Sequence, residues 1–231
     1  MKGLRKKLQH RPRQHTLVDV ALLTRLHGCF NHDTQKDAAV WAALLFCFFT
    51  FFRRSNVVLD SKTSFDPKRH LQRKDVLTSP SGLLVYTKWS KTLQHRERVL
   101  QIPLVPIPDS VLCPVSAYQH MCTLIPASPD SPAFVLPSST NTARPLTTSI
   151  LEKALAKAIK ALALPKGAVT LHDLRRGGYT LAFQAGVPRE LRQLHGDWKS
   201  DADHLYLTAN IRDRLKLPSA LRDYILRHTS T

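Results

Sequence analysis

The sequence has few acidic residues, and this shortage limits the kinds of partner that fit it. Asp and Glu total 17 against 34 Lys and Arg, which gives a formal net charge of +17 and an isoelectric point near 10.2. Such a balance is typical of a protein that neutralises several backbone phosphates of a nucleic acid. A ribosomal or other RNA-binding protein is one class with this charge. However, 43% apolar residues and several amphipathic segments favour one packed, enzyme-like core over a charged tail.

Paired cysteines are also lacking, and no cluster of carboxylates stands in the sequence. The four cysteines, Cys29, Cys47, Cys113 and Cys122, form no Cys-x-x-Cys motif, and the residues around Cys47 are apolar. We therefore expect reduced thiols in an intracellular protein and no disulfides. The 11 histidines are scattered, and one close to a cysteine is more often coincidence than a ligand pair. The sequence thus predicts neither a metal site nor a cofactor.

The chain has no apolar run long enough to span a membrane. Residues 38–52 are apolar except for Thr50, but a membrane-spanning helix needs about 20 such residues. The run also lies too far from the N-terminus for a signal peptide, and Arg53 and Arg54 follow it directly. We predict a helix buried on most sides that delivers Arg53 from the core to a site, and we expect no membrane partner.

A His and an Arg stand three residues apart near the C-terminus. His172 and Arg175 lie on one face of any helix that they share. The imidazole can handle a proton, while the guanidinium can hold a phosphate through two parallel hydrogen bonds. Taken alone, such a pair is more often an ordinary surface pair.

The residues after this pair make it part of a longer ordered set. A Gly196-Asp197-Trp198 turn follows, and then Tyr206, whose hydroxyl is a candidate nucleophile. This ordered set resembles the C-terminal half of the tyrosine recombinase (phage integrase) catalytic domain. The variant GDWKSDA is similar to the branch found in eukaryotic mobile elements, the Cryptons and the DIRS-type retroelements. The resemblance implies an α+β fold, mainly α-helical, with a small antiparallel β-sheet.

This family also has an earlier Arg and a Lys, and the upstream sequence contains a match for each. The register with Ser55 in Phe-Phe-Arg-Arg-Ser assigns the first role to Arg53, with Arg54 as the fallback. The family's Lys lies in a β-hairpin, and residues 83–88 and 98–104 have the composition of two strands. Between them the Ser-Lys-Thr register favours Lys91 over Lys88. The resemblance covers about residues 36–210.

The resemblance implies a particular chemistry on DNA. The Tyr206 hydroxyl attacks a phosphorus, Arg53 and Arg175 hold the non-bridging oxygens, and a 3′-phosphotyrosyl link replaces the broken bond. Lys91 protonates the departing 5′-oxygen, and His172 positions the phosphate and relays the tyrosine proton. Two guanidiniums supply the charge that a metal ion gives in nucleases. Two alternatives stay open: a degenerate or domesticated recombinase that binds DNA without cleaving it, and a nicking enzyme like the type IB topoisomerases.

Two positions depart from the family's pattern. The family usually has His or Trp nine residues before the tyrosine, where this chain has Asp197. We call hydrogen-bond donation to the phosphate from this position the third role. We assign it to Trp198, because an indole N–H can donate to a phosphate oxygen and an ionised carboxylate would repel it. His195 is another candidate. Asn56 stands where an acid is commoner and offers only a neutral hydrogen bond of about 1 kcal/mol.

The expected organisation is a short N-terminal part followed by one catalytic domain. Residues 1–35 predict a basic arm and a helix that a Thr16–Asp19 capping box opens and that runs to about Phe30. The resemblance implies that this part is a shortened remnant of the family's DNA-clamping domain and that residues 36–231 form the recombinase-like catalytic domain. Further helices are expected at 112–124, at 149–164 behind a Ser149–Glu152 capping box, on either side of 186–188, and at 213–228. The partners implied are double-stranded DNA and further copies of the chain, as a dimer or tetramer, in the nucleus.

Overall fold

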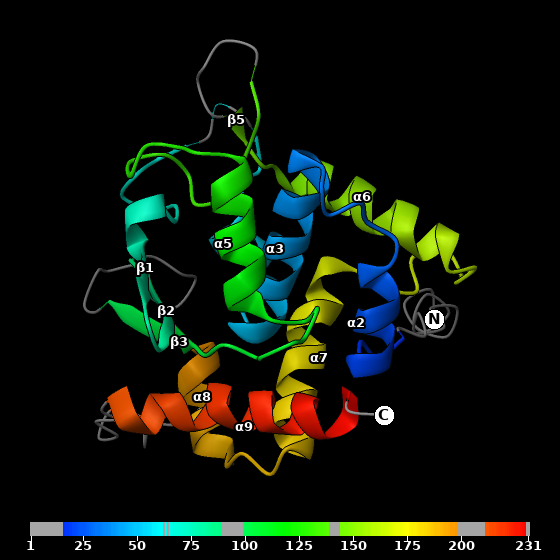
Figure 1. The fold of residues 1–231 in the computed structure, drawn as a ribbon, viewed down its shortest axis with the longest axis vertical. Coiled ribbons are helices and arrows are strands. Elements are labelled where there is room, and N and C mark those ends of the chain that lie inside the picture. The colour runs from blue at the N-terminus through cyan, green and yellow to red at the C-terminus, as the bar shows by residue number, and fades with distance from the viewer. Residues whose placement is uncertain are drawn as a thin grey trace, which may run out of the picture.

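The computed structural model describes residues 16–61, 63, 65–88, 99–138, 144–197 and 211–229, with the backbone alone at 212 and 213. Helices dominate it, and a three-stranded antiparallel sheet flanks them (Figure 1). This is the predicted α+β fold. In chain order the elements are α2 (Val20–His27), α3 (Gln35–Phe49), α4 (Arg54–Val57), the 3-10 turn η1 (Arg73–Asp75), β1 (Val76–Ser79), β2 (Gly82–Thr87), β3 (Leu100–Leu104), α5 (Pro114–Leu124), β4 (Val135–Leu136), β5 (Arg144–Pro145), α6 (Thr148–Ala161), α7 (Leu171–Gln184), α8 (Arg189–Gly196) and α9 (Ile211–Thr229).

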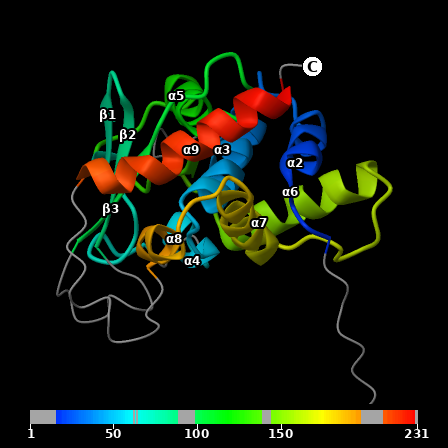
Figure 2. The same ribbon diagram turned by 90° about the horizontal axis from the view of Figure 1, so that it is seen from below.

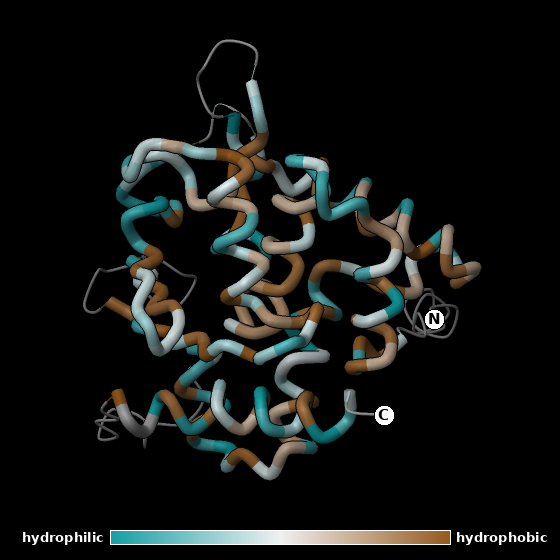
Figure 3. The backbone as a smooth tube through the Cα atoms, in the orientation of Figure 1, coloured by the Kyte–Doolittle hydropathy of each residue, from teal (hydrophilic) through white to brown (hydrophobic). Residues whose placement is uncertain are grey.

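Helix α3 forms the centre of the core, as its apolar run predicts. Every residue from Ala38 to Phe49 is buried, and α5, α6 and α7 pack around the helix. The Thr34 hydroxyl caps its start by accepting from the Asp37 N–H. Figure 3 shows the hydrophobic colouring concentrated along this central helix. The described residues contain no helix that is long and apolar enough to cross a membrane.

Two adjacent glycines let α7 approach α3 more closely than any other residue would allow. A Cβ atom on Gly177 would lie 2.2 Å from the Val18 carbonyl oxygen, and one on Gly178 would lie 2.0 Å from the Phe48 carbonyl oxygen. Both distances are far shorter than a normal contact. Gly178 therefore seats α7, the helix of His172 and Arg175, against the end of α3, and Gly177 seats it against the segment before α2.

The three-stranded sheet is a meander in the order β1-β2-β3, with Val85 opposite both Val76 and Ile102. Strands β2 and β3 confirm the hairpin predicted around residues 83–88 and 98–104. Strand β1 was not predicted: only its first residue is buried, so the sequence there lacks the alternation of apolar residues that marks a strand.

The last helix, α9, packs against α7, α8 and β3 of its own chain (Figure 2). Leu217, Leu221 and Ile225 recur every fourth residue and are fully buried. The Arg214 guanidinium donates to the Gln101 carbonyl of β3 over 3.1 Å. At the other end of the chain, α2 contributes Leu22, Leu23 and Leu26 to the same core. The predicted boundary at residue 35, between a short N-terminal part and the catalytic domain, stays a prediction.

Candidate active site

A strained turn follows α3 and begins the site. Phe51 is fully buried and adopts a left-handed backbone conformation with φ of 54°, which is uncommon for a bulky residue. The turn directs the Phe51 carbonyl at the guanidinium of Arg175, which donates to it. Arg53 follows as the N-cap residue of α4. Backbone strain of this kind costs on the order of 1–3 kcal/mol and persists only where the surroundings enforce it.

Arg175 joins three parts of the chain. It sits on α7, donates to Phe51 after α3, and donates over 3.1 Å to the carbonyl of Gly196 at the end of α8. Its side chain is buried. Burial, followed by the positive charge of Arg53, lowers the pKa of Arg175 to about 10, against the opposing effect of the Asp197 carboxylate. Arg175 therefore stays charged at neutral pH, and its head group is held in one orientation.

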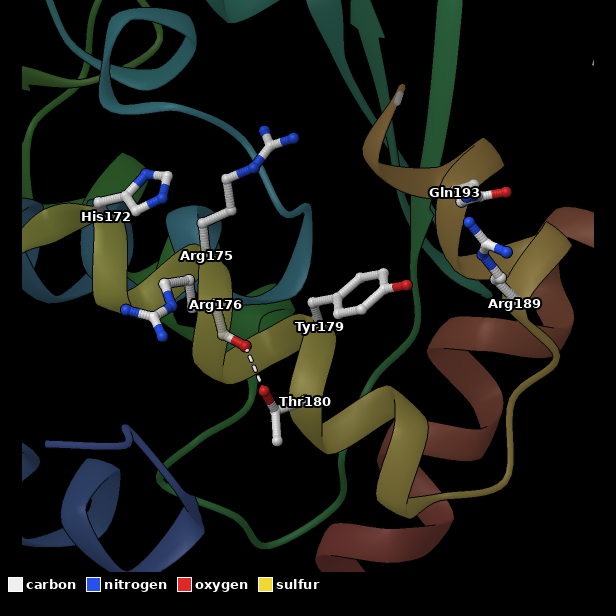
Figure 4. A pocket seen from close by; sticks show the side chains of 7 residues that line it. All are labelled: His172, Arg175, Arg176, Tyr179, Thr180, Arg189 and Gln193. Carbon is white, nitrogen blue, oxygen red and sulfur yellow. Dashed lines mark hydrogen bonds between the residues drawn. The ribbon is translucent and has the colours of Figure 1, made fainter. Parts of the chain in front are cut away.

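His172 lies between two cavities and connects them. The larger, of about 420 Å³, lies between α7 and α8 (Figure 4), and the smaller, of about 280 Å³, opens at the start of α4. Arg175 contributes to the first and Arg53 to the second, while His172 lines both. The structure thus brings these three predicted residues together across 122 positions of sequence. The larger cavity is lined by His172, Arg175, Arg176, Tyr179, Thr180, Arg189 and Gln193, and the smaller by Arg53, Arg54, Ser55, Asp60 and His172.

The surroundings of His172 favour the neutral form of its imidazole. Partial burial lowers its pKa from the usual value, and the nearby guanidinium of Arg175 adds to this effect. A neutral ring can accept a proton at one nitrogen and donate one at the other. This is the protonation state that a proton relay from a tyrosine hydroxyl requires.

His195, a candidate for the third role, is packed inside the protein. Its Nε2 lies 2.8 Å from the Phe49 carbonyl oxygen, and its ring meets that of Phe51 at 4.9 Å. Because a carbonyl only accepts, Nε2 carries the hydrogen. Complete burial lowers the pKa of His195 to about 4, so the ring is neutral. These contacts fasten α8 to the end of α3, which is a positioning role.

Asp197 ends α8 in a left-handed conformation, with φ of 51°. Asp tolerates this region better than most residues. Its side chain is buried, and its charge acts on Arg175. The structure therefore places a carboxylate at the position nine residues before Tyr206. Trp198, to which we assigned the third role, lies outside the described residues, as do Lys91 and Tyr206, and these three assignments stay predictions.

Lys88, the alternative to Lys91, is bound at the base of the hairpin. Its Nζ lies 2.6 Å from Oδ1 of Asp75, a nearly buried carboxylate, and 3.4 Å from the side-chain oxygen of Gln72. Asp75 also accepts from the Gln72 backbone N–H over 3.0 Å. Through these contacts Lys88, the residue directly after β2, ties the end of that strand to the turn η1. The assignment of the family's lysine to Lys91 stays a prediction.

The sequence analysis missed most of the larger cavity's wall. Arg176, Tyr179 and Thr180 on α7 and Arg189 and Gln193 on α8 were not singled out, although all five line it. One signal was available: positions 172, 176, 179 and 180 recur at the spacing of a single helix face. The described residues contain no group of three or more His, Cys, Asp or Glu side chains placed to hold a metal ion.

Comparisons with known proteins identify the fold. No protein-family model matches the chain. No curated protein sequence matches it. Among solved structures, the XerH site-specific recombinase bound to its difH substrate aligns with a TM-score of 0.56 and 16% identity, over 87% of this chain and 52% of that one.

Two further solved structures align over similar lengths. The lambda integrase dimer bound to a COC′ core site gives a TM-score of 0.55 and 16% identity, over 87% of this chain and 64% of that one. The FLP recombinase–Holliday junction complex gives 0.55 and 15%, over 95% and 52%. The chain thus spans about half the length of XerH and FLP. At these identities the likeness concerns the backbone alone, and the chain has the catalytic-domain fold of the tyrosine recombinases.

Proposed function

We propose that this protein cleaves and rejoins DNA strands through a 3′-phosphotyrosyl intermediate. One observation carries the proposal: Arg53, His172 and Arg175 line two adjoining cavities, and His172 belongs to both. Two guanidiniums beside a neutral imidazole suit a phosphodiester, since the arginines match the oxygens that gain negative charge and the imidazole can move a proton. The recombinase fold supports the same assignment.

The proposed reaction conserves the energy of the broken bond. The Tyr206 oxygen attacks the phosphorus and loses its proton by way of His172, the bond from phosphorus to the 5′-oxygen breaks, and Lys91 protonates that oxygen. Arg53 and Arg175 stabilise the charge that builds on the non-bridging oxygens. A 5′-hydroxyl from a second strand then attacks the phosphotyrosine and reseals the backbone. Trp198 is the proposed further donor to the phosphate.

The wider proposal concerns the setting of this reaction. The net charge of +17 supports double-stranded DNA as the partner. The Gly-Asp-Trp-Lys-Ser-Asp-Ala segment, residues 196–202, supports an origin in the Crypton or DIRS-type branch of mobile elements and therefore a nuclear location. Rejoining between two duplexes needs more than one active site, so the protein is proposed to act as a dimer or tetramer on DNA.

Covalent trapping tests the proposal. The purified protein is incubated, without added metal, with nicked duplexes drawn from the DNA that flanks its own gene, so that the released fragment dissociates and the enzyme stays attached. The wild type is expected to give an SDS-resistant, protease-sensitive adduct. Tyr206→Phe is expected to give none, because a phenyl ring has no oxygen to bond phosphorus. Tyr224→Phe, on α9, is the matched control and keeps the adduct. An adduct that persists in Tyr206→Phe refutes the assignment of the nucleophile.

A second candidate function is DNA binding without cleavage. It is favoured by the buried Asp197 carboxylate beside Arg175, because negative charge at this point weakens the hold on a phosphate. The neutral Asn56, also buried, points the same way. Two variants separate the roles in the turn: Trp198→Phe is expected to slow adduct formation more than Asp197→Ala does. The reverse order moves the third role to Asp197, and a wild type without adduct on every flanking duplex favours the binder.

A further inference from the structure

The wall of the larger cavity that faces Arg175 is built by residues outside the predicted site. Figure 4 shows the Tyr179 side chain extending from α7 toward α8, where Arg189 and Gln193 stand one turn apart. Gln193 is buried and Arg189 is exposed at the cavity's edge. The cavity is therefore lined by side chains of two helices, with the Tyr179 phenol on the same helix as Arg175 and the Arg189 guanidinium on α8.

The cavity is suited to an anion. None of its described lining residues is acidic, whereas three are arginines and the others are His, Tyr, Thr and Gln. The nearest acid on α7, Asp173, is bound within the helix start: its Oδ2 accepts from the Thr170 backbone N–H and hydroxyl, at 2.8 and 2.6 Å. Its Oδ1 lies 3.4 Å from the Arg176 guanidinium. The charge of the cavity's lining is thus positive, and the buried Asp197 carboxylate, which acts on Arg175, is not among the lining residues.

A cation held between two aromatic rings fixes Tyr179 in place. The Arg192 guanidinium lies 4.6 Å from the centre of the Tyr179 ring and 5.0 Å from that of Phe183, and its Nε donates to the Val187 carbonyl over 3.1 Å. Such contacts are worth about 0.5–2 kcal/mol each. The phenol is thus ordered before any ligand arrives, which lowers the entropy cost of binding through its hydroxyl.

We propose that this cavity binds a second backbone phosphate of the same DNA strand, next to the phosphate held by Arg53 and Arg175. Arg189 is its principal ligand, and the Tyr179 hydroxyl donates a hydrogen bond to it. The proposal rests on the proposed function. Because one strand carries a phosphate at every nucleotide, about 3.4 Å of rise apart, a strand that enters the cavity of Arg53 continues past the shared His172 into this one. Two held phosphates fix the position and direction of the strand at the cleavage point.

The dependence of affinity on salt counts the phosphates that the protein neutralises. On one short duplex, each lost phosphate contact lowers the slope of log affinity against log salt by about 0.9. Arg189→Ala is expected to lower the slope by about this amount, and Arg189→Lys to retain it. Arg25→Ala removes an equal charge from the exposed face of α2 and is expected to leave the slope unchanged. Tyr179→Phe is expected to weaken binding a few-fold at a constant slope.

A double variant shows whether one phosphate or two are bound. If Arg53 and Arg189 hold separate phosphates, the combined Arg53→Ala and Arg189→Ala substitutions lower the slope by the sum of the two single losses. A combined loss equal to either single loss means that they share one phosphate and overturns the inference. An unchanged slope in Arg189→Ala, with the wild type still binding, overturns it and spares the proposed function. A wild type that binds no duplex overturns both.

Discussion

At the scale of single residues, the site depends on how tightly Arg175 is held. The guanidinium is buried, two backbone carbonyls from different segments orient it, and two opposite charges, those of Arg53 and Asp197, act on it. A charge that is removed from water needs such partners to remain ionised. These partners also fix the directions of the guanidinium N–H donors before a ligand binds. Arg53 occupies the N-cap position of α4, makes no side-chain cap hydrogen bond there, and is partly exposed.

Arg175→Lys tests this orientation, because the substitution keeps the charge and removes the planar fork. An ammonium cannot bond the carbonyls of Phe51 and Gly196 and also bridge two phosphate oxygens. We expect the rate of covalent adduct formation to fall by roughly 100-fold or more. Thermal unfolding of the variant serves as the control for folding. Wild-type rates in Arg175→Lys contradict a bidentate role.

His195 gives a prediction for the pH dependence of stability. Its pKa is about 4 in the folded protein and near 6.5 in an unfolded chain. Between these values the unfolded state binds more protons, so stability falls as the pH falls from about 6.5 to about 4. The shift corresponds to roughly 3 kcal/mol.

His195→Gln keeps an N–H for the Phe49 carbonyl and removes the titrating group. Denaturant unfolding of the wild type and of this variant is measured at several pH values. We expect the free energy of unfolding to decline less steeply for the variant over the range between 6.5 and 4. Parallel curves mean that His195 is charged or exposed in the folded protein.

At the scale of elements, the sequence predicted most helices but not how their ends are capped. Helix α5 begins at Pro114, directly after Cys113, as predicted. The break between α7 and α8 contains residues 186–188, also as predicted. Two predicted caps were wrong. Asp19 is the N-cap of α2, so that helix starts after Thr16, and Thr147 precedes α6 in the place of Ser149. Several polar residues near a helix start can serve as the cap, and tertiary packing selects among them.

The tertiary arrangement of the site was less visible in the sequence. The resemblance to tyrosine recombinases identified His172 and Arg175, but no local pattern reveals that Phe51 takes a positive φ and points its carbonyl at Arg175. The cavity wall on α8 was missed because Arg189 and Gln193 match no motif of that family. The shape of this cavity depends on how α7 and α8 meet, which a helical pattern does not specify.

Gly178→Ala tests how α7 is seated on α3. The added Cβ atom would lie 2.0 Å from the Phe48 carbonyl oxygen, so the helices must separate. We expect a loss of more than about 2 kcal/mol in the free energy of unfolding. DNA affinity should also fall at temperatures where the variant stays folded, because the helix carries His172 and Arg175.

Gly28→Ala is the matched control for this substitution. Its Cβ atom would meet only the Arg25 carbonyl oxygen at 3.6 Å, an ordinary contact, and its φ of −63° suits alanine. We expect an effect within about 0.5 kcal/mol for Gly28→Ala. Equal losses in the two variants would mean that the α7–α3 contact adjusts freely.

At the scale of the whole molecule, positive charge and active-site geometry act at different distances. The net charge of +17 favours any nucleic acid, whereas in the proposed function the two cavities beside His172 distinguish a phosphodiester placed for attack. The proposed binding and the proposed cleavage can therefore be tested separately. A variant without the nucleophile retains nearly all of the charge and both cavities, and differs from the wild type by one oxygen atom.

The last prediction uses this separation. The affinity of the wild type for duplex DNA should fall steeply as salt rises, with a log–log slope of about 0.9 for each neutralised phosphate. Tyr206→Phe should show the same affinity and the same slope, because a phenol hydroxyl carries no charge at neutral pH. Fluorescence anisotropy with a labelled duplex at several salt concentrations measures both. A flat salt response would point to a partner other than a nucleic acid. A large loss of affinity in Tyr206→Phe would mean that this hydroxyl binds the DNA in the ground state, and not only at the moment of attack.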